Sequence, residues 1–457
     1  MKKLEGRALL CLALVAALVA GLILFVVKLE INGSTWASFY GNSHIYKNGK
    51  LAVGSVYDRN GKRLLKNTKN GLKYNSDEEI RRATLHAVGD PSGNIASGAN
   101  VAFRSKMIGY NFVTGTGGLF NTSGSKVALT IDAKVCREAY EALGGRNGLV
   151  GVYNYKTGEI ICMASTPTYD PGEKGENTLS NPLPGTYMNK LLSGTLTPGS
   201  TFKLVTTAAA IENKADLDTW SYQCTGSLTV GADKITCPKV HGTMDIYGAL
   251  ANSCNCAYAT LAMDLGGETL SEYAKALGLE SSYDIDGIST AAGSFNFDSA
   301  NVNIGWAGIG QFEDQVNPLS MMVYMGAIAG EGKAARPVLL RDASLLEKGA
   351  EIIGKESQTA KNGTVRLLET QTAKEISDMM RNNVKITYGD GNYPGLSLHA
   401  KSGTAEVGTG KAPHSWFCGF SGNYAFIVCV ENGGYGSSVA GPVANRVLQY
   451  MKSENYF

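Results

Sequence analysis

Twenty uncharged, mainly apolar residues lie near the start of the chain, from Ala8 to Val27. As a helix this segment would be about 30 Å long, which matches the hydrocarbon core of a membrane. A cleavable signal peptide usually has a shorter apolar region, of about 7–15 residues, so the segment predicts an uncleaved anchor. The sequence contains no second apolar run of this length, and we expect the chain to cross the membrane once.

The charges before this segment predict its orientation. Lys2, Lys3 and Arg7 precede it, and basic residues beside a span favour the cytoplasmic side. We therefore expect residues 1–7 to form a cytoplasmic tail, residues 8–27 the anchor, and the rest to lie outside the cell.

The composition is that of a folded protein. Apolar residues make up 44% of the sequence and charged residues 18%, which predicts a folded globular chain rather than a disordered one. The net charge of +2 gives no reason to expect a nucleic acid as partner.

The region after the anchor, residues 28–125, carries little readable chemistry. It mixes short apolar pieces with turns, and Asn60-Gly61 is typical of a hairpin tip. Residues 90–118 are rich in Gly, Ser and Asn and should be mostly loops. We predict a small N-terminal, or pedestal, domain that holds the rest of the chain away from the lipid.

Strand and helix patterns become clear in residues 126–457. The expected strands are 127–131, 149–155, 159–165, 396–402, 415–420 and 424–431. The expected helices are 133–143, capped by Asp132, a run starting near residue 200, 244–279 with a break at Gly266-Gly267, 318–329 and 443–451. Late antiparallel strands that rejoin an early hairpin, with helices between them, predict one α+β domain.

A serine and a lysine stand at the start of one predicted helix. Ser200 and Lys203 lie three residues apart, so their side chains share a helix face, and the lysine can act as base for a serine nucleophile. The free N–H groups at a helix start would stabilise an oxyanion there. Alone the pattern is weak, because Ser123 and Lys126 have the same spacing in a Gly/Ser-rich loop.

Two further short motifs follow along the chain. Ser253-Cys254-Asn255 lies in a segment that flanks a predicted helix, and Lys401-Ser402-Gly403-Thr404 lies at a predicted strand. Each motif is common by itself. Their order, spacing and local context are much rarer in combination, because a helix start, a helix-flanking loop and a strand must follow one another.

Together the motifs resemble the serine acyltransferase set of penicillin-binding proteins and β-lactamases. From residue 127 onward the chain is similar to class B penicillin-binding proteins, the monofunctional peptidoglycan transpeptidases. Other segments that look like this family are Tyr57-Asp58-Arg59-Asn60-Gly61, Gly308-Ile309-Gly310-Gln311, Asn317-Pro318-Leu319 and Trp416-Phe417-Cys418-Gly419-Phe420. The resemblance implies an antiparallel five-stranded sheet flanked by helices, no cofactor, and attachment to the bacterial cytoplasmic membrane. The chain departs from the family in its short N-terminal domain and in Ser402, where Thr is common.

The resemblance also implies a role for each motif residue. Ser200 would attack a stem peptide that ends in D-Ala-D-Ala, and the acyl group would pass to the amine of a neighbouring stem peptide. Lys203 would take the proton, with its pKa lowered by burial and by the nearby cation Lys401. Ser253 would relay a proton to the leaving amine, and Asn255 would fix Lys203 and the substrate.

The third motif is expected to bind the substrate. The N–H groups of Ser200 and Thr404 would form the oxyanion hole, and the side chains of Lys401, Ser402 and Thr404, beside Gly403, suit a terminal carboxylate. A β-lactam would acylate the same serine. The implied partners are peptidoglycan stem peptides, β-lactam antibiotics, the cytoplasmic membrane and other cell-wall synthesis proteins such as a glycosyltransferase.

Other functions stay open at this point. A D,D-carboxypeptidase differs only in using water as the acceptor. The segment Ser200-Thr201-Phe202-Lys203 resembles class D β-lactamases, but their second motif usually ends in Val, whereas Asn255 stands here. A third alternative is a penicillin sensor or scaffold that is acylated without turnover.

Nine cysteines are spread along the sequence. Cys224 and Cys237 bracket a predicted hairpin and are the best candidates for a disulfide, which is permitted outside the membrane. Cys254 and Cys256 lack a second cluster of ligands, so we expect no metal site.

Overall fold

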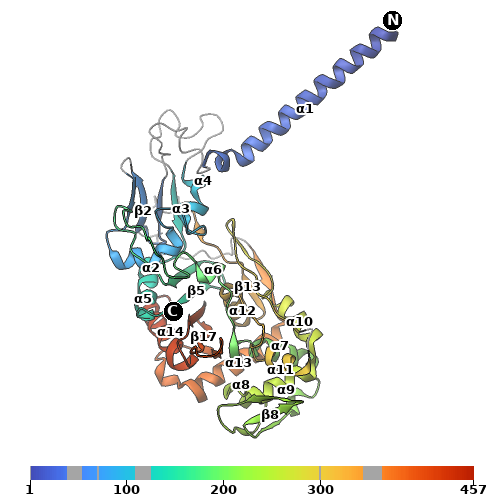
Figure 1. Ribbon diagram of the computed structural model, residues 1–457, viewed down its shortest axis with the longest axis vertical. Helices are drawn as coiled ribbons and strands as arrows, with labels where there is room; N and C mark the ends of the chain where they lie inside the picture. Colours follow the sequence, from blue (N-terminus) through green and yellow to red (C-terminus); the bar gives the residue numbers. More distant parts are fainter. Residues whose placement is uncertain (1, 39–53, 69–70, 109–124, 298–299, 343–362) are drawn as a thin grey trace.

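The computed structural model describes residues 2–38, 54–68, 71–108, 125–297, 300–342 and 363–457. A long N-terminal helix projects from the rest of the molecule (Figure 1). A small sheet follows it, and a larger body of helices and strands lies beyond that sheet, at the end away from the N-terminus.

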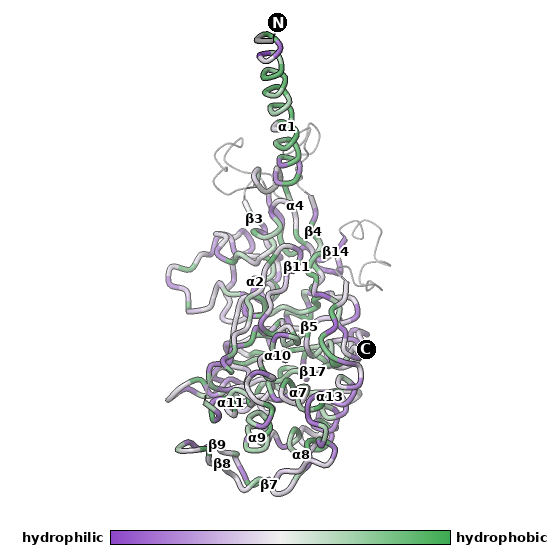
Figure 2. The backbone as a smooth tube through the Cα atoms, turned by 90° about the vertical axis from the view of Figure 1, so that its right-hand side faces the viewer, coloured by the Kyte–Doolittle hydropathy of each residue, from purple (hydrophilic) through white to green (hydrophobic). Residues whose placement is uncertain are grey.

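The projecting helix α1 (Lys2–Ser38) contains the predicted anchor. Its span Leu4–Gly33 contains an 18-residue apolar window in which no residue is buried against the protein, and Figure 2 shows the hydrophobic colour along most of the helix. Among the described residues, α1 is the one helix that is long and apolar enough to cross a membrane. This exposed apolar helix fits a single-pass membrane anchor.

A five-stranded sheet lies next to the anchor helix. Across the sheet its strands are β14 (Leu340–Arg341), β4 (Lys126–Leu129), β1 (Ser55–Tyr57), β2 (Arg63–Thr68) and β3 (Gly71–Tyr74). β1 and β2 pair as an antiparallel hairpin whose turn contains Gly61 with a φ of 77°, as Asn60-Gly61 predicted. Because β4 and β14 come from later in the chain, this sheet crosses the boundary predicted at residue 126, and the domain division stays a prediction.

Three helices fill out the N-terminal region. They are α2 (Glu78–Val88), α3 (Ala99–Ala102) and α4 (Arg104–Met107). The Asp77 side chain caps α2 by accepting hydrogen bonds from the N–H groups of Glu79 and Ile80. The two short helices lie in the segment predicted to be mostly loops, and residues 109–118 of that segment are outside the described residues.

The larger body is built on an antiparallel five-stranded sheet. In order across the sheet its strands are β16 (His399–Ala405), β17 (His414–Ser421), β18 (Tyr424–Val430), β5 (Gly148–Asn154) and β6 (Ile160–Thr166). Ile427 of β18 pairs with Gly151 of β5, so the late strands rejoin the early hairpin. This arrangement confirms the predicted α+β class and the five-stranded antiparallel sheet.

Helices cover both faces of this sheet. As a result, every residue of β5, β6 and β18 is buried. α5 (Ala133–Leu143) and α14 (Gly436–Ser453) pack against each other and against the sheet, and α12 (Pro318–Ala329) also packs on it. α5 and α12 have the predicted bounds, whereas α14 begins at Gly436 instead of residue 443 and contains Pro442.

The remaining elements lie between β6 and β16 in the sequence. The helices are α6 (Lys190–Ser193), α7 (Lys203–Asn213), α8 (Ile246–Ala251), α9 (Asn255–Leu265), α10 (Gly267–Ala276), α11 (Asn301–Ala307) and α13 (Thr370–Asn383). The short strands are β7 (Tyr222–Cys224), β8 (Ser227–Val230), β9 (Asp233–Thr236), β10 (Gly242–Met244), β11 (Asp284–Ile285), β12 (Ile288–Ser289), β13 (Lys333–Ala335) and β15 (Thr364–Arg366). The helical run expected over 244–279 breaks at Gly266 as predicted, and it also breaks between α8 and α9, at the helix-flanking segment in which the second motif was expected.

Candidate active site

The three sequence motifs meet beside β16, an edge strand of the larger sheet. Ser200 lies in a short 3₁₀ turn, Gly199–Thr201, directly before α7, and Lys203 is the first residue of α7. Ser253 lies in the loop between α8 and α9, and Lys401 lies on β16. Residues separated by two hundred positions in the sequence therefore form one cluster.

Glycines bring the serine turn against β16. Gly199 has a φ of 55°, and a Cβ there would lie 2.7 Å from the carbonyl oxygen of Thr404. Its N–H donates to the carbonyl of Gly310 at 2.8 Å, and a Cβ at Gly310 would lie 2.0 Å from the Gly199 oxygen. Neither position has room for a side chain, which explains why glycine stands at both.

Two longer side chains secure the segment before the serine. The indole Nε1 of Trp416 donates to the carbonyl of Thr197 at 2.9 Å, and Nε2 of Gln315 donates to the Thr197 hydroxyl at 2.9 Å. Trp416 lies on β17 and is fully buried. Gly310 and Trp416, which lie in segments that resembled the family, thus hold the serine turn in place together with Gln315.

Lys203 is fully buried and its ammonium nitrogen contacts the second motif. The nitrogen donates to the carbonyl oxygen of Ser253 at 2.7 Å, to the Ser253 hydroxyl at 3.3 Å and to Oδ1 of Asn255 at 2.8 Å. Burial lowers the pKa of Lys203 to about 7. A neutral amine, as a base requires, is therefore accessible near neutral pH.

Lys401 approaches the same serine from the other side. Its Nζ donates to the Ser253 hydroxyl at 3.0 Å and to the carbonyl of Ser402 at 2.8 Å. Burial first, and the charge of Lys203 second, lower the pKa of Lys401 well below its ordinary value. The sequence interpretation expected burial and the charge of Lys401 to lower the pKa of Lys203 together; burial is the cause that lowers it.

The loop between α8 and α9 presents the second motif. Ser253 has a φ of 51°, an uncommon value for a residue with a side chain, and Cys254 caps α9 directly after it. Nδ2 of Asn255 donates to the carbonyl of Thr236 at 2.9 Å, so its oxygen is left to face Lys203. The Ser253 hydroxyl is within hydrogen-bond distance of both ammonium groups, which is the geometry that a proton relay needs.

Within the described part of the chain, the Ser200 hydroxyl has no hydrogen-bond partner and is half-buried. Its oxygen is thus open to an incoming carbonyl. The hydroxyl of Thr404 accepts a hydrogen bond from the Gly436 N–H at 3.2 Å. The hydroxyl of Ser402 accepts one from the phenol of Tyr388 at 3.0 Å, and the Ser402 N–H donates to the same phenol at 2.8 Å.

Tyr388 is a site residue that the sequence did not reveal. It is buried, and it orients Ser402 through the two hydrogen bonds above. It lies at the end of an irregular helical turn after α13 and belongs to no short motif. Only the tertiary packing of this turn against β16 identifies it.

The cysteines do not follow the sequence prediction. Cys224 and Cys237 are free thiols, so the proposed bridge is not formed. The Cys237 sulfur lies 3.6 Å from that of Cys254 and 3.4 Å from that of Cys256, because the start of α9 folds back onto the hairpin. The sequence interpretation expected no further ligands near Cys254. In the structure, the ligand atoms of Cys224, Cys237, Cys254 and His241 all lie within 4.8 Å of one another.

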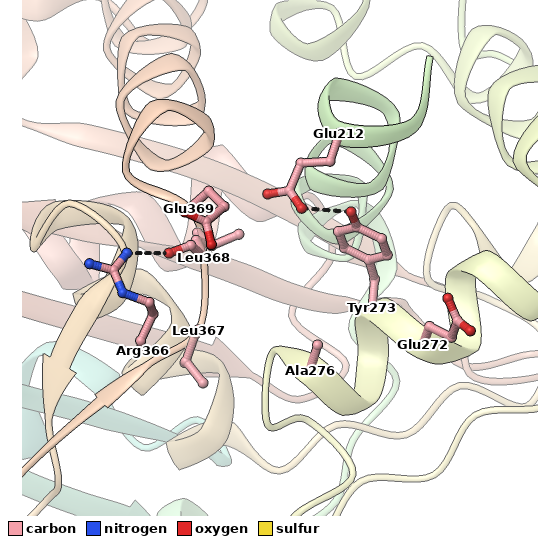
Figure 3. A pocket seen from close by; sticks show the side chains of 8 residues that line it. All are labelled: Glu212, Glu272, Tyr273, Ala276, Arg366, Leu367, Leu368 and Glu369. Carbon is pink, nitrogen blue, oxygen red and sulfur yellow. Dashed lines mark hydrogen bonds between the residues drawn. The ribbon is translucent and has the colours of Figure 1, made fainter. Parts of the chain in front are cut away.

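A separate pocket of about 370 Å³ lies at the other end of α7 (Figure 3). Its lining residues are Glu212, Glu272, Tyr273, Ala276, Arg366, Leu367, Leu368 and Glu369. Tyr273 donates to Glu212 at 2.7 Å, on the last turn of α7, whereas Ser200 precedes its first turn. Because α7 has 11 residues and is about 16 Å long, this pocket is distinct from the motif cluster.

Known proteins resemble this chain over most of its length. The family described as the penicillin binding protein transpeptidase domain matches residues 148–449, more than half of the chain. The chain is 28% identical to the peptidoglycan D,D-transpeptidase PbpA of Mycolicibacterium smegmatis over 370 residues, which are 71% of this chain and 72% of that protein. It is also 28% identical to PbpA of Mycobacterium tuberculosis over 367 residues, 71% of this chain and 72% of that protein.

Solved structures have the same fold. A ceftriaxone acyl-enzyme complex of penicillin-binding protein A from M. tuberculosis superposes with a TM-score of 0.73 and 23% identity, covering 87% of this chain and 97% of that one. A D,D-transpeptidase domain from Eggerthella lenta superposes with a TM-score of 0.74 and 23% identity, covering 89% of this chain and 99% of that one.

Proposed function

Because this chain belongs to the family of penicillin-binding protein transpeptidase domains, we propose that it is a peptidoglycan D,D-transpeptidase with Ser200 as its nucleophile. One observation carries the assignment of residues: the ammonium groups of Lys203 and Lys401 both contact the hydroxyl of Ser253, and the turn that carries Ser200 packs on the strand that carries Lys401. The names of the PbpA relatives support the reaction class.

In the proposed acylation step, neutral Lys203 takes the proton of Ser200 as the serine oxygen attacks the carbonyl of a D-Ala-D-Ala stem peptide. The peptide bond to the terminal D-Ala breaks, and its amine leaves with a proton delivered through Ser253. Asn255 keeps Lys203 aimed at this relay. The acyl group is then bonded to Ser200.

The N–H groups of Ser200 and Thr404 would bind the developing oxyanion, each worth about 3–4 kcal/mol in the transition state. The packing of the Ser200 turn on β16 supports this role. Lys401, with the Ser402 and Thr404 hydroxyls beside Gly403, would receive the terminal carboxylate. The amine of a neighbouring stem peptide then takes the acyl group, and a β-lactam enters by the same acylation step.

The anchor supports a location for this reaction. Lys2, Lys3 and Arg7 lie before the apolar part of α1. We therefore place the N-terminus on the cytoplasmic side of the membrane and the catalytic part on the outer side. Stem peptides are carried on glycan strands that another enzyme must polymerise. A glycosyltransferase is accordingly the kind of cell-wall protein that we propose as a partner.

The test is mass spectrometry of the full chain, in detergent, after incubation with a penicillin. We expect a stable adduct on Ser200 and none on Ser200→Ala, whose fold should be unchanged because the hydroxyl has no partner. An adduct on the alanine variant, or none on the folded wild-type protein, would overturn the assignment. An adduct that decays while penicillin is consumed would indicate a β-lactamase instead.

A second assay separates transpeptidase from carboxypeptidase. The full chain is given a D-Ala-D-Ala donor peptide with and without an amine acceptor. We expect a cross-linked product whose yield rises with acceptor concentration. Hydrolysis alone, at every acceptor concentration, would identify a D,D-carboxypeptidase.

A further inference from the structure

Three cysteines and a histidine converge beside the second motif, from four separate segments. Cys224 ends β7, Cys237 follows β9, His241 precedes β10, and Cys254 caps α9. Their ligand atoms all lie within 4.8 Å of one another. Cys224 and Cys254 are buried, and the other two are half-buried.

The spacing of these atoms is that of ligands around one small ion. With Zn–S bonds of about 2.3 Å and Zn–N bonds of about 2.0–2.1 Å, tetrahedral ligands lie roughly 3.5–3.8 Å apart. The sulfurs of Cys237 and Cys254 are 3.6 Å apart, and the Cys224 sulfur is 3.4 Å from Nδ1 of His241. A disulfide needs about 2.05 Å. We infer that Cys224, Cys237, His241 and Cys254 form a zinc-binding site.

The first turn of α9 supplies the outer hydrogen bonds of such a site. The N–H of Ala257 points at the Cys254 sulfur and the N–H of Cys256 at the Cys237 sulfur, each at 3.4 Å. Hydrogen bonds of this kind orient thiolate ligands in metal sites. Three thiolates and an imidazole in a tetrahedral arrangement suit Zn²⁺ better than Mg²⁺ or Ca²⁺, which prefer oxygen.

The segment that carries three of the ligands has almost no core of its own. Residues 222–244 form two two-stranded sheets at the end of the molecule opposite α1 (Figures 1 and 2). Among their apolar side chains, Cys224, Ile235 and Met244 are the buried ones. Segments this small usually need a metal or a disulfide to hold their shape, because they bury too little apolar surface.

The zinc site would also hold the second motif in position, a consequence that rests on the proposed function. Cys254 stands between Ser253 and Asn255, and the Thr236 carbonyl that fixes Asn255 directly precedes Cys237. Two of the four ligands are thus adjacent in the sequence to residues that position Lys203 or its partner Asn255. Cys237 and Cys254 act as positioning residues, because they reach the reaction through Asn255 and Ser253.

The site is tested by the metal content of the full chain, purified in detergent without chelator. We expect about one zinc per chain by mass spectrometry of the metal, and the visible absorption of tetrahedral thiolate-bound Co²⁺ after exchange. Cys224→Ser and His241→Ala should lose most of the metal. Cys256→Ser is the matched control and should keep it, because the Cys256 sulfur contacts Cys237 at 3.4 Å but lies outside the four-ligand group and points at the Ile235 carbonyl.

Wild-type protein without zinc and without the Co²⁺ absorption, or with a disulfide among these cysteines, would overturn the site. This result does not depend on whether the variants fold. Equal metal content in Cys224→Ser, His241→Ala and the wild type would overturn it as well.

Penicillin acylation of the same preparation tests the positioning role separately. Chelator should slow acylation of Ser200 by roughly tenfold, and added Zn²⁺ should restore it. Unchanged acylation after verified loss of zinc would overturn the positioning role alone. Zinc bound to a protein that penicillin never acylates would overturn the proposed function and leave the zinc site standing.

Discussion

The ammonium nitrogen of Lys203 is buried between Ser253 and Asn255, and burial lowers its pKa to about 7. The neutral form is the one that can accept the Ser200 proton, so the rate should rise as the pH rises through this pKa. We expect the rate constant of acylation by penicillin to increase about tenfold between pH 6 and pH 8 and then to level off. A stopped-flow profile that is flat or falls over this range would exclude Lys203 as the base.

Arginine at the same position should stop the reaction, because a guanidinium keeps its proton at every relevant pH. For Lys203→Arg we expect acylation to fall by about 10²–10⁴-fold, the usual contribution of a general base. The matched control is Lys275→Arg on the exposed side of α10, which should react like the wild type. Wild-type acylation by Lys203→Arg would remove Lys203 from the mechanism.

At the scale of elements, one buried carboxylate ties three segments of the chain together. Glu159, which is 3% exposed and directly precedes β6, binds Arg59 from the β1–β2 turn at 3.3 Å and Arg341 from β14 at 3.0 Å. The small sheet next to the anchor is thereby joined to the larger body. Neither partner could be matched to Glu159 from the sequence, because the pairs are separated by 100 and 182 positions.

Glu159→Gln should therefore destabilise the protein by about 3–5 kcal/mol, since it leaves two guanidinium groups without their buried counter-charge. The denaturation midpoint of the full chain in detergent measures this loss. Glu173→Gln is the control: its carboxylate pairs with Lys73 at the surface, where both side chains are about half exposed, and little change is expected. Equal midpoints for Glu159→Gln and the wild type would show that the triad contributes nothing.

Elements with local signals were predictable from the sequence. Asp132 caps α5 and Asn317-Pro318 starts α12, so both helices have the predicted bounds. The position of Ser200 at a helix start could be predicted, because a Pro-Gly turn precedes it and an apolar run follows it. The three motifs could be placed in order, but not in contact, since their contact depends on how β16 and α7 pack.

Features that depend on tertiary contacts were not predictable. The break at Ser253 separates α8 from α9, and the return of α9 onto the hairpin brings Cys254 to Cys237. The return of α9 has no local signature, which is why the sequence suggested a simple bridge between Cys224 and Cys237 and no metal ligands. Tyr388 was missed for the same reason, because its partner Ser402 lies across a packing interface.

At the scale of the whole molecule, the anchor sets where the chemistry can take place. α1 projects from the body (Figure 1), its apolar window is not buried, and Lys2, Lys3 and Arg7 come at the start of its sequence. Stem peptides that are to be cross-linked lie outside the membrane, so the proposed transpeptidase works only if the body is there too. Orientation and function are thus coupled, and a test of one bears on the other.

A protease added to intact spheroplasts tests the orientation. We expect it to degrade the body of the chain while a cytoplasmic marker protein survives, because basic residues before a membrane span favour the cytoplasmic side. Changing Lys2, Lys3 and Arg7 together to glutamate should increase the protected fraction, since the charge bias is then removed. The Lys275→Arg variant serves as a control for expression and should be degraded like the wild type. Full protection of the wild-type body until the membrane is dissolved would place it in the cytoplasm, away from its proposed substrate.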